Sequence, residues 1–235
     1  MNALYSAALW LVGGLHFALC VGVFSVAWLL VDPRRTDPLL RLFCRNIVRL
    51  AGARLEVARA PGFDAARPGF IVSNHVNVFD AFVLYAALPQ FARGLELESH
   101  FKIPVYGPMM RRLGVVPVHV VKSPAGLRRM WTLAEAALKA GTSLAVFPEG
   151  GRTQDGTLKP FRDGVFRMAQ RFSAPIYPVT ISGAFEWHRR GSWRLHPGRV
   201  VVTLHPPIET AGLSDAEVPA LRQRVRGVIE SALKG

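Results

Sequence analysis

The chain has 235 residues and carries 29 Lys and Arg against 16 Asp and Glu, a formal net charge of +13. Its length fits one main domain with an appendage, and 50% hydrophobic residues are enough for a sizeable core. The basic residues are scattered and no nucleic-acid motif accompanies them, so we expect anionic membrane lipids and no nucleic acid as partners. Cys20 and Cys44 give neither a disulfide framework nor a metal site, which suits a reducing cytoplasmic face.

The N-terminal segment is predicted to enter a membrane. Residues 1–31 contain no Asp, Glu, Lys or Arg, and residues 3–31 are mostly apolar. A bilayer core of about 30 Å takes about 20 helical residues, so this run is long enough to span it. No positive region precedes the run, which disfavours a signal peptide. Gly13 and Gly14 leave room for a break, so a helix that dips into one leaflet is the alternative to a full span.

The next segment is basic and amphipathic. Its arginines alternate with apolar residues up to Leu50, at Arg34, Arg35, Arg41, Arg45 and Arg49. By the positive-inside tendency, the chain after residue 32 faces the cytoplasm. The pattern predicts a helix that lies in the membrane interface, packs on the following domain, or does both with opposite faces. We therefore divide the chain into residues 1–50, the membrane segment with its amphipathic helix, and residues 51–235, the main domain.

Beyond residue 50, short apolar runs alternate with helical patterns, which predicts an α/β fold with a mixed sheet. Strands are expected at 54–57, 70–73, 94–97, 115–121, 143–147, 176–181 and 200–204. Helices are expected at 78–88, 108–113, 124–140, 161–172 and 214–233. Reactive loops of such sheets gather at strand ends. No metal-ligand cluster is evident, and we expect neither a metal nor a cofactor.

His75 and Asp80 follow the strand expected at 70–73, with four residues between them. Positions five apart on a straight helix point roughly 140° away from each other, so His75 must lie in the turn before the helix if the two are to meet. An imidazole held by a carboxylate can take a proton from a hydroxyl near pH 7. The alternative is a surface histidine beside a helix whose first turn carries an Asp because of the helix dipole.

A turn with two glycines follows the strand expected at 143–147. It presents Glu149 and Arg152 where the backbone can approach a ligand closely, and Arg152 offers a planar fork of donors suited to phosphate. A β-turn with solvated charges is the alternative interpretation. Further along, Trp187, His188, Arg189, Arg190 and Trp193 form an aromatic and basic cluster. We interpret this cluster first as an exposed loop and second as an interfacial membrane contact.

Four motifs occur in order: His-x4-Asp at 75–80, Phe-Pro-Glu-Gly-x-Arg at 147–152, Pro-Phe-x-x-Gly at 160–164 and Ala-Pro-Ile-x-Pro-Val at 174–179. Together they resemble the glycerolipid acyltransferase family, most closely the 1-acylglycerol-3-phosphate O-acyltransferases, over roughly residues 50 to 210. The resemblance implies that His75 is the general base on an acceptor hydroxyl and that Asp80 holds its tautomer. It also implies that Glu149 and Gly150 shape the acceptor site and that Arg152 holds the acceptor phosphate. The hydroxyl would attack the thioester of acyl-CoA or acyl-carrier protein directly.

Two positions depart from the family pattern. Glu98 and Val120 stand where the family usually has a Lys and an Arg, cations that the resemblance assigns to the acceptor phosphate. Their loss should weaken a phosphate site, because charge-assisted hydrogen bonds are the strong ones. Either Lys122, Arg111 or Arg112 substitutes, or the acceptor is a lyso-aminolipid such as lyso-ornithine lipid.

The resulting hypothesis is a membrane-bound acyltransferase that esterifies a lysolipid on the cytoplasmic face, with 1-acylglycerol-3-phosphate as first-choice acceptor and phosphatidic acid as product. A lyso-ornithine-lipid acyltransferase and a non-catalytic lipid-binding membrane protein are the alternatives. The histidines other than His75 are interpreted as structural or solvated.

Overall fold

A seven-stranded sheet forms the centre of the computed structural model, which describes residues 3–118 and 123–233. The strands are β1 (Ala53–Arg59), β2 (Phe70–Ser73), β3 (Ala92–Leu97), β4 (Val116–Val118), β5 (Ser143–Val146), β6 (Ile176–Ser182) and β7 (Gly198–Leu204). Their order in the sheet is β1-β7-β6-β2-β5-β3-β4. Neighbours are parallel except β6 and β7, which are antiparallel, so the predicted mixed sheet is confirmed.

Strand β2 lies in the middle of the sheet, between β6 and β5. Ile71 is in register with Tyr177 of β6 and with Ala145 of β5. All four β2 residues are buried, as expected for a strand that is covered on both faces. Because β2 and β5 are parallel neighbours, the segments that follow them emerge side by side at one edge of the sheet.

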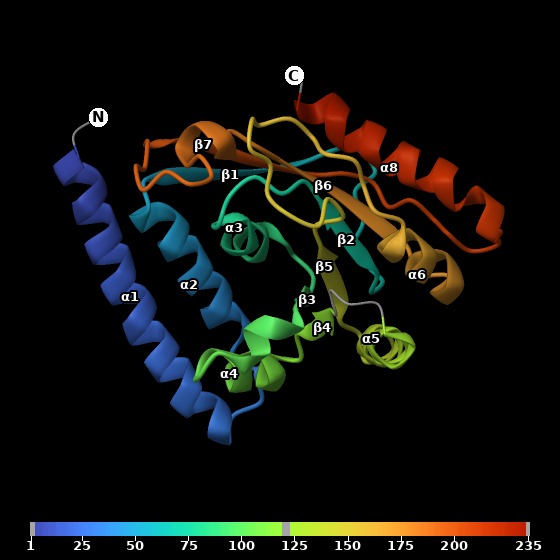
Figure 1. Ribbon diagram of the computed structural model, residues 1–235, viewed down its shortest axis with the longest axis horizontal. Coiled ribbons are helices and arrows are strands. Elements are labelled where there is room, and N and C mark those ends of the chain that lie inside the picture. The colour runs from blue at the N-terminus through green and yellow to red at the C-terminus, as the bar shows by residue number, and fades with distance from the viewer. Residues whose placement is uncertain (1–2, 119–122, 234–235) are drawn as a thin grey trace.

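Helices cover both faces of the sheet (Figure 1). One face carries α1 (Ala3–Leu30), α2 (Asp37–Leu50), α3 (Asp80–Ala87) and the short α7 (Ala184–Trp187), whose buried side chains form one hydrophobic cluster. The other face carries α5 (Pro124–Lys139), α6 (Gly164–Phe172) and α8 (Val218–Leu233), with a second cluster. The chain is completed by the 3-10 turn η1 (Glu98–Lys102), α4 (Tyr106–Leu113) and the 3-10 turn η2 (Asp215–Glu217).

Three helices begin later than the sequence predicts because local contacts hold their first residues in turns. Helix α3 begins at Asp80 rather than 78, since the Asn77 side chain accepts a bond from the Phe79 amide and closes a turn before it. Helix α6 begins at Gly164 rather than 161, since the Arg162 amide donates to the Pro148 carbonyl and keeps this stretch against the preceding loop. Helix α8 begins at Val218 rather than 214, since Ser214 and Glu217 form a capping box around the 3-10 turn η2 that precedes it.

Helix α1 is long and apolar enough to cross a membrane and is a candidate membrane anchor. Only 6% of its most apolar window is buried in the described chain, so most of its side chains face outward. Two of its buried residues lie near α2: Phe24 stacks on Trp28 with ring centroids 4.8 Å apart, and Phe24 lies edge-on to Phe43 of α2. The third, Ser6, bonds to the backbone of Leu195. The helix runs alongside α2 at the edge of the molecule (Figure 1).

Helix α2 packs on the domain with one face. Arg41 donates to the Gln90 carbonyl at 2.6 Å and Arg45 to the Ala86 carbonyl at 3.2 Å, so two of its arginines hold it to the end of α3 and the residues that follow. Leu39 and Leu42 remain 58% and 54% exposed. Of the two predicted roles for residues 34–50, packing on the domain is therefore seen, and an apolar surface remains outside it.

The buried histidine His205 makes stability depend on pH. Burial lowers the pKa of His205 below its ordinary value of 6.5, and its Nε2 lies 2.9 Å from the Thr180 hydroxyl. The unfolded chain therefore takes up a proton that the folded chain resists, so this contribution to stability is complete above about pH 6.5 and is lost as the pH falls. We expect the free energy of unfolding to decrease below that pH by at most about 1.4 kcal/mol per pH unit for this group.

Urea unfolding at a series of pH values measures this effect. His205→Gln keeps a hydrogen-bonding partner for Thr180 but cannot titrate, so its unfolding free energy should depend less steeply on pH than that of the wild type. Equal pH slopes in the two proteins would show that His205 does not contribute to the acid sensitivity.

Candidate active site

His75 and Asp80 meet at the end of β2. His75 Nδ1 lies 2.7 Å from Asp80 Oδ2, with His75 in the turn before α3 and Asp80 as its first residue. The Asp80 side chain is fully buried, whereas 23% of the His75 side chain is exposed. The imidazole ring stacks on Phe147, with ring centroids 4.1 Å apart. A carboxylate that accepts from Nδ1–H leaves Nε2 as the ring's proton acceptor, on a side chain that solvent can reach.

The Asp80 carboxylate also organises the turn that carries His75. Its Oδ2 accepts the backbone N–H groups of Val76 and Asn77 as well as the imidazole. Its Oδ1 is buried and has no hydrogen-bond partner among the described residues. One oxygen therefore holds both the ring and the backbone beneath it, which limits the imidazole to one orientation.

Two asparagines, which sequence reasoning did not single out, fix this turn to the sheet. The Asn74 side chain donates to the Ile181 carbonyl at 2.9 Å and accepts from the Ile181 amide at 2.8 Å. The Asn77 side chain donates to the Ala184 carbonyl at 2.8 Å. Both side chains are buried. Two amide residues in an otherwise apolar stretch, one just before His75 and one between His75 and Asp80, were the signal in the sequence that could have identified them.

Glu149 is buried against the backbone of the same turn. Its Oε1 accepts the His75 amide at 2.6 Å and its Oε2 accepts the Lys159 amide at 3.0 Å, so the carboxylate connects two loops. Burial raises the pKa of Glu149, and these two hydrogen bonds act in the opposite direction. The interpretation of this turn as one with solvated charges is wrong for Glu149, which is 3% exposed.

Glu149→Gln should weaken this connection without removing the side chain. One carboxylate oxygen becomes an NH₂ group that faces a backbone donor, and an unsatisfied buried donor costs about 1–3 kcal/mol. We expect the free energy of unfolding to fall by that amount, together with a loss of transfer activity because the His75 backbone loses its support. Chemical unfolding and initial rates measure the two effects. Glu135→Gln, which alters an exposed ion pair on α5, is the control, and equal stability of Glu149→Gln and this control would contradict the prediction.

Gly150 and Arg152 lie on the turn that follows Glu149. Gly150 has a φ of 67°, a backbone conformation that favours glycine, and a Cβ at this position would lie 2.6 Å from the Arg162 guanidinium, so that side chain would have to move. The Arg152 carbonyl accepts from Arg190 Nη1 at 3.1 Å. The next residue, Thr153, donates its amide to the His75 carbonyl at 2.9 Å. The structure thus gathers His75, Asp80 and the 149–153 turn at one edge of the sheet.

The aromatic and basic cluster is only partly the exposed loop that the sequence suggested. Trp187 is fully buried: it stacks on Phe79 with centroids 4.7 Å apart, and its indole N–H donates to the Ala51 carbonyl. His188 is 4% exposed and lies edge-on to Phe79, the residue before Asp80. Trp193 is 51% exposed, as predicted. The expectation fails for the first two residues because Phe79 packs against both rings and Trp10 of α1 lies edge-on to His188.

The cations proposed to replace those missing at Glu98 and Val120 have other contacts. Arg111 donates to the Phe101 carbonyl at 2.9 Å, and Arg112 donates to the Trp28 carbonyl of α1 at 2.6 Å. Val120 and Lys122 lie outside the described residues.

His100 provides a comparison for the His75 pair, because it too has a carboxylate neighbour. Its Nδ1 lies 2.8 Å from a carboxylate oxygen of Glu96, four residues before it in the chain. Glu96 is partly exposed and also accepts from the Tyr106 hydroxyl. Asp80 differs in being buried and bonded to the backbone beneath its own histidine.

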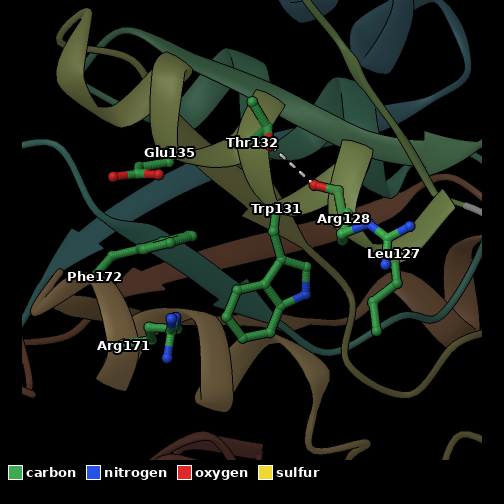
Figure 2. A pocket seen from close by; sticks show the side chains of 7 residues that line it. All are labelled: Leu127, Arg128, Trp131, Thr132, Glu135, Arg171 and Phe172. Carbon is green, nitrogen blue, oxygen red and sulfur yellow. Dashed lines mark hydrogen bonds between the residues drawn. The ribbon is translucent and has the colours of Figure 1, made fainter. Parts of the chain in front are cut away.

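Two hollows in the surface of the described residues are lined by residues other than His75, Asp80 and the 149–153 turn. One, of about 340 Å³, lies between α5 and α6. Figure 2 shows Trp131 between Arg128 and Arg171, with Phe172 beside Arg171. Another, of about 410 Å³, lies between the end of α1 and α4 and includes Trp28. Across residues 3–118 and 123–233, no group of three or more His, Cys, Asp or Glu side chains could hold a metal ion.

Comparisons with known proteins agree with the motifs. The Acyltransferase family model matches residues 54–182, just over half of the chain. The chain is 30% identical to 1-acyl-sn-glycerol-3-phosphate acyltransferase alpha of Ovis aries over 188 residues, which cover 80% of this chain and 66% of that protein. It is 30% identical to the beta form of Homo sapiens over 213 residues, which cover 88% and 77%.

The fold is also similar to a solved structure. The crystal structure of the 1-acyl-sn-glycerophosphate (LPA) acyltransferase PlsC from Thermotoga maritima has a TM-score of 0.82 to this chain at 23% identity, covering 99% of this chain and 95% of that one. This chain spans about 66% of the length of the alpha relatives it matches. On the family match and the relatives together, the chain belongs to the Acyltransferase family.

Proposed function

We propose that the protein is an O-acyltransferase that transfers an acyl group from a thioester donor, acyl-CoA or acyl-carrier protein, to the free hydroxyl of a lysophospholipid. The first-choice acceptor is 1-acylglycerol-3-phosphate, and the product is then phosphatidic acid. This proposal rests on the 2.7 Å contact between the partly exposed imidazole of His75 and the buried carboxylate of Asp80. Family membership and the names of the matched relatives support the choice of reaction.

The proposed reaction uses His75 as a general base. His75 Nε2 takes the proton of the acceptor hydroxyl while that oxygen attacks the thioester carbonyl. Asp80, bonded to Nδ1, stabilises the imidazolium that forms. The tetrahedral intermediate then expels the donor thiolate, which takes the proton from the imidazolium, so the products are an ester and a free thiol. No acyl-enzyme is required, because the acceptor oxygen is itself the nucleophile.

The neighbouring residues shape the acceptor site in this proposal. Glu149 and Gly150 set the path of the loop beside His75, and Arg152 binds the acceptor phosphate through its fork of donors. The phosphate of the acceptor carries the negative charge that an arginine recognises most strongly. We assign these roles to the turn because it is bonded to the backbone of His75 on both sides.

The N-terminal segment places this chemistry at a membrane. We propose that residues 1–50 anchor the protein, and that residues 51–235 carry the reaction on the cytoplasmic face. The outward apolar surface of α1, together with the exposed Leu39 and Leu42 of α2, supports insertion. Anionic lipids are proposed partners, because the chain carries a net charge of +13.

An acceptor panel tests the proposed function. The purified protein in vesicles is given one radiolabelled acyl donor with lysophosphatidic acid, lyso-ornithine lipid or lysophosphatidylcholine. We expect transfer to lysophosphatidic acid above the other two. Preference for lyso-ornithine lipid would make that lipid the acceptor in place of lysophosphatidic acid. The acidic Glu98, the first residue of η1, would favour this outcome. Absence of transfer to every acceptor, from both acyl-CoA and acyl-carrier protein, would support a lipid-binding role without catalysis.

A further inference from the structure

Four cationic side chains surround the turn at residues 149–153. Arg152 belongs to the turn, Lys159 Nζ donates to the Gly151 carbonyl at 3.1 Å, and the Arg162 guanidinium lies against Gly150. The fourth, Arg190, comes from the connection between β6 and β7 and donates to the Arg152 carbonyl at 3.1 Å. Two of these cations, Arg162 and Arg190, are exposed, so solvent and substrate can reach them.

Nearby carboxylates form no close ion pair with this group among the residues that the structure describes. In the described part of the chain, none of the four has an Asp or Glu oxygen within 4.0 Å. The Glu149 carboxylate is bonded to two backbone amides, and Asp155 Oδ1 accepts from Thr153 and Thr157. Cations gathered with few counter-charges repel one another, and an anion bound among them relieves that repulsion.

Arg190 is held in place by buried neighbours. Trp187 and His188 precede it and are almost fully buried, and the His196 amide closes the loop by donating to the Trp187 carbonyl at 2.9 Å. The Arg189 guanidinium lies over the Phe185 ring, 5.3 Å from the ring centroid. Because the backbone of this loop is fixed by buried residues, Arg190 loses less conformational entropy on binding a ligand than an arginine on a free loop would lose.

We propose that Arg190 is a specificity-determining residue that, together with Arg152, binds the phosphate monoester of the acceptor. This inference rests on the proposed function, since it names the group that contacts the acceptor of that reaction. A phosphate monoester presents three oxygens and nearly two negative charges at neutral pH, more than one guanidinium fork satisfies. The bonded turn places the anion beside His75, because Thr153 and Glu149 both bond to the backbone of that residue.

Arg190→Gln tests this assignment in the full-length protein in neutral detergent micelles. At saturating donor, we expect the KM for 1-acylglycerol-3-phosphate to rise about tenfold, the effect of losing one hydrogen bond to a charged group. The kcat and the KM for the donor should stay within about twofold of the wild type. Arg190→Lys keeps the charge but loses the planar fork of donors. Its KM for 1-acylglycerol-3-phosphate should therefore lie between those of the wild type and Arg190→Gln.

Arg194→Gln is the matched control, because Arg194 is an exposed arginine on the same loop and its replacement removes the same charge. We expect its kinetics to match the wild type. An unchanged acceptor KM in Arg190→Gln, or an equal rise in the control, would overturn the assignment. If the KM for the donor rose instead, Arg190 would bind the phosphates of the donor, and the assignment would also be overturned. Failure of the wild type to acylate this acceptor would refute the proposed function itself.

Discussion

His75→Ala is expected to lower kcat/KM for acyl transfer by about 10²- to 10⁴-fold, the usual contribution of a positioned general base. The variant should still fold, because 23% of the His75 side chain is exposed and its turn is held mainly through Asp80, Asn74 and backbone bonds. Initial rates with a radiolabelled donor, measured alongside thermal unfolding, separate loss of chemistry from loss of structure.

His100→Ala is the matched control for this prediction. His100 also has a carboxylate 2.8 Å from its Nδ1, but it lies on η1, outside the site proposed here. We expect its rate to stay near that of the wild type. Equal activity of His75→Ala and the wild type would exclude a general base at His75, and an equal loss in both variants would show that the effect is not specific to the site.

Asp80→Asn should also reduce kcat, on the order of 10²- to 10⁴-fold, although it preserves the shape of the side chain. The amide oxygen can take the place of Oδ2 and accept from His75, Val76 and Asn77, but it offers no negative charge to the imidazolium. The amide NH₂ would take the place of Oδ1, which is buried and has no partner among the described residues, so stability should fall by about 1–3 kcal/mol.

Asp37→Asn tests whether any buried carboxylate would give the same result. Asp37 is buried and pairs with Arg93 at 2.9 Å and with Arg41 at 2.7 Å, far in sequence from the His75 turn. We expect this variant to lose stability, because it leaves Arg93 without its charge partner, but to keep the wild-type kcat per folded molecule. If Asp37→Asn lost as much kcat as Asp80→Asn, the electrostatic role of Asp80 would be contradicted.

The spacing of His75 and Asp80 predicted the local geometry that a contact between them needs, and the family resemblance implied the contact itself. Residues five apart cannot face each other on one helix, so the pair required a turn followed by a helix start, and the structure has this arrangement. The contacts of Glu149 were not predictable. Its carboxylate accepts amides from His75 and Lys159, and a sequence pattern does not show which distant backbone donors a buried acid will meet.

The amino-acid sequence alone determined the apolar N-terminal helix, the alternation of strands and helices and the order of the reactive motifs, because each depends on neighbouring residues and on local periodicity. Only the tertiary structure decided that Trp187 and His188 are buried and that Arg190 contacts the Arg152 backbone. The burial of a side chain and the charges around it depend on which segments of the chain pack together. Residues 152 and 190 became neighbours only when β5 and β6 took their places on either side of β2.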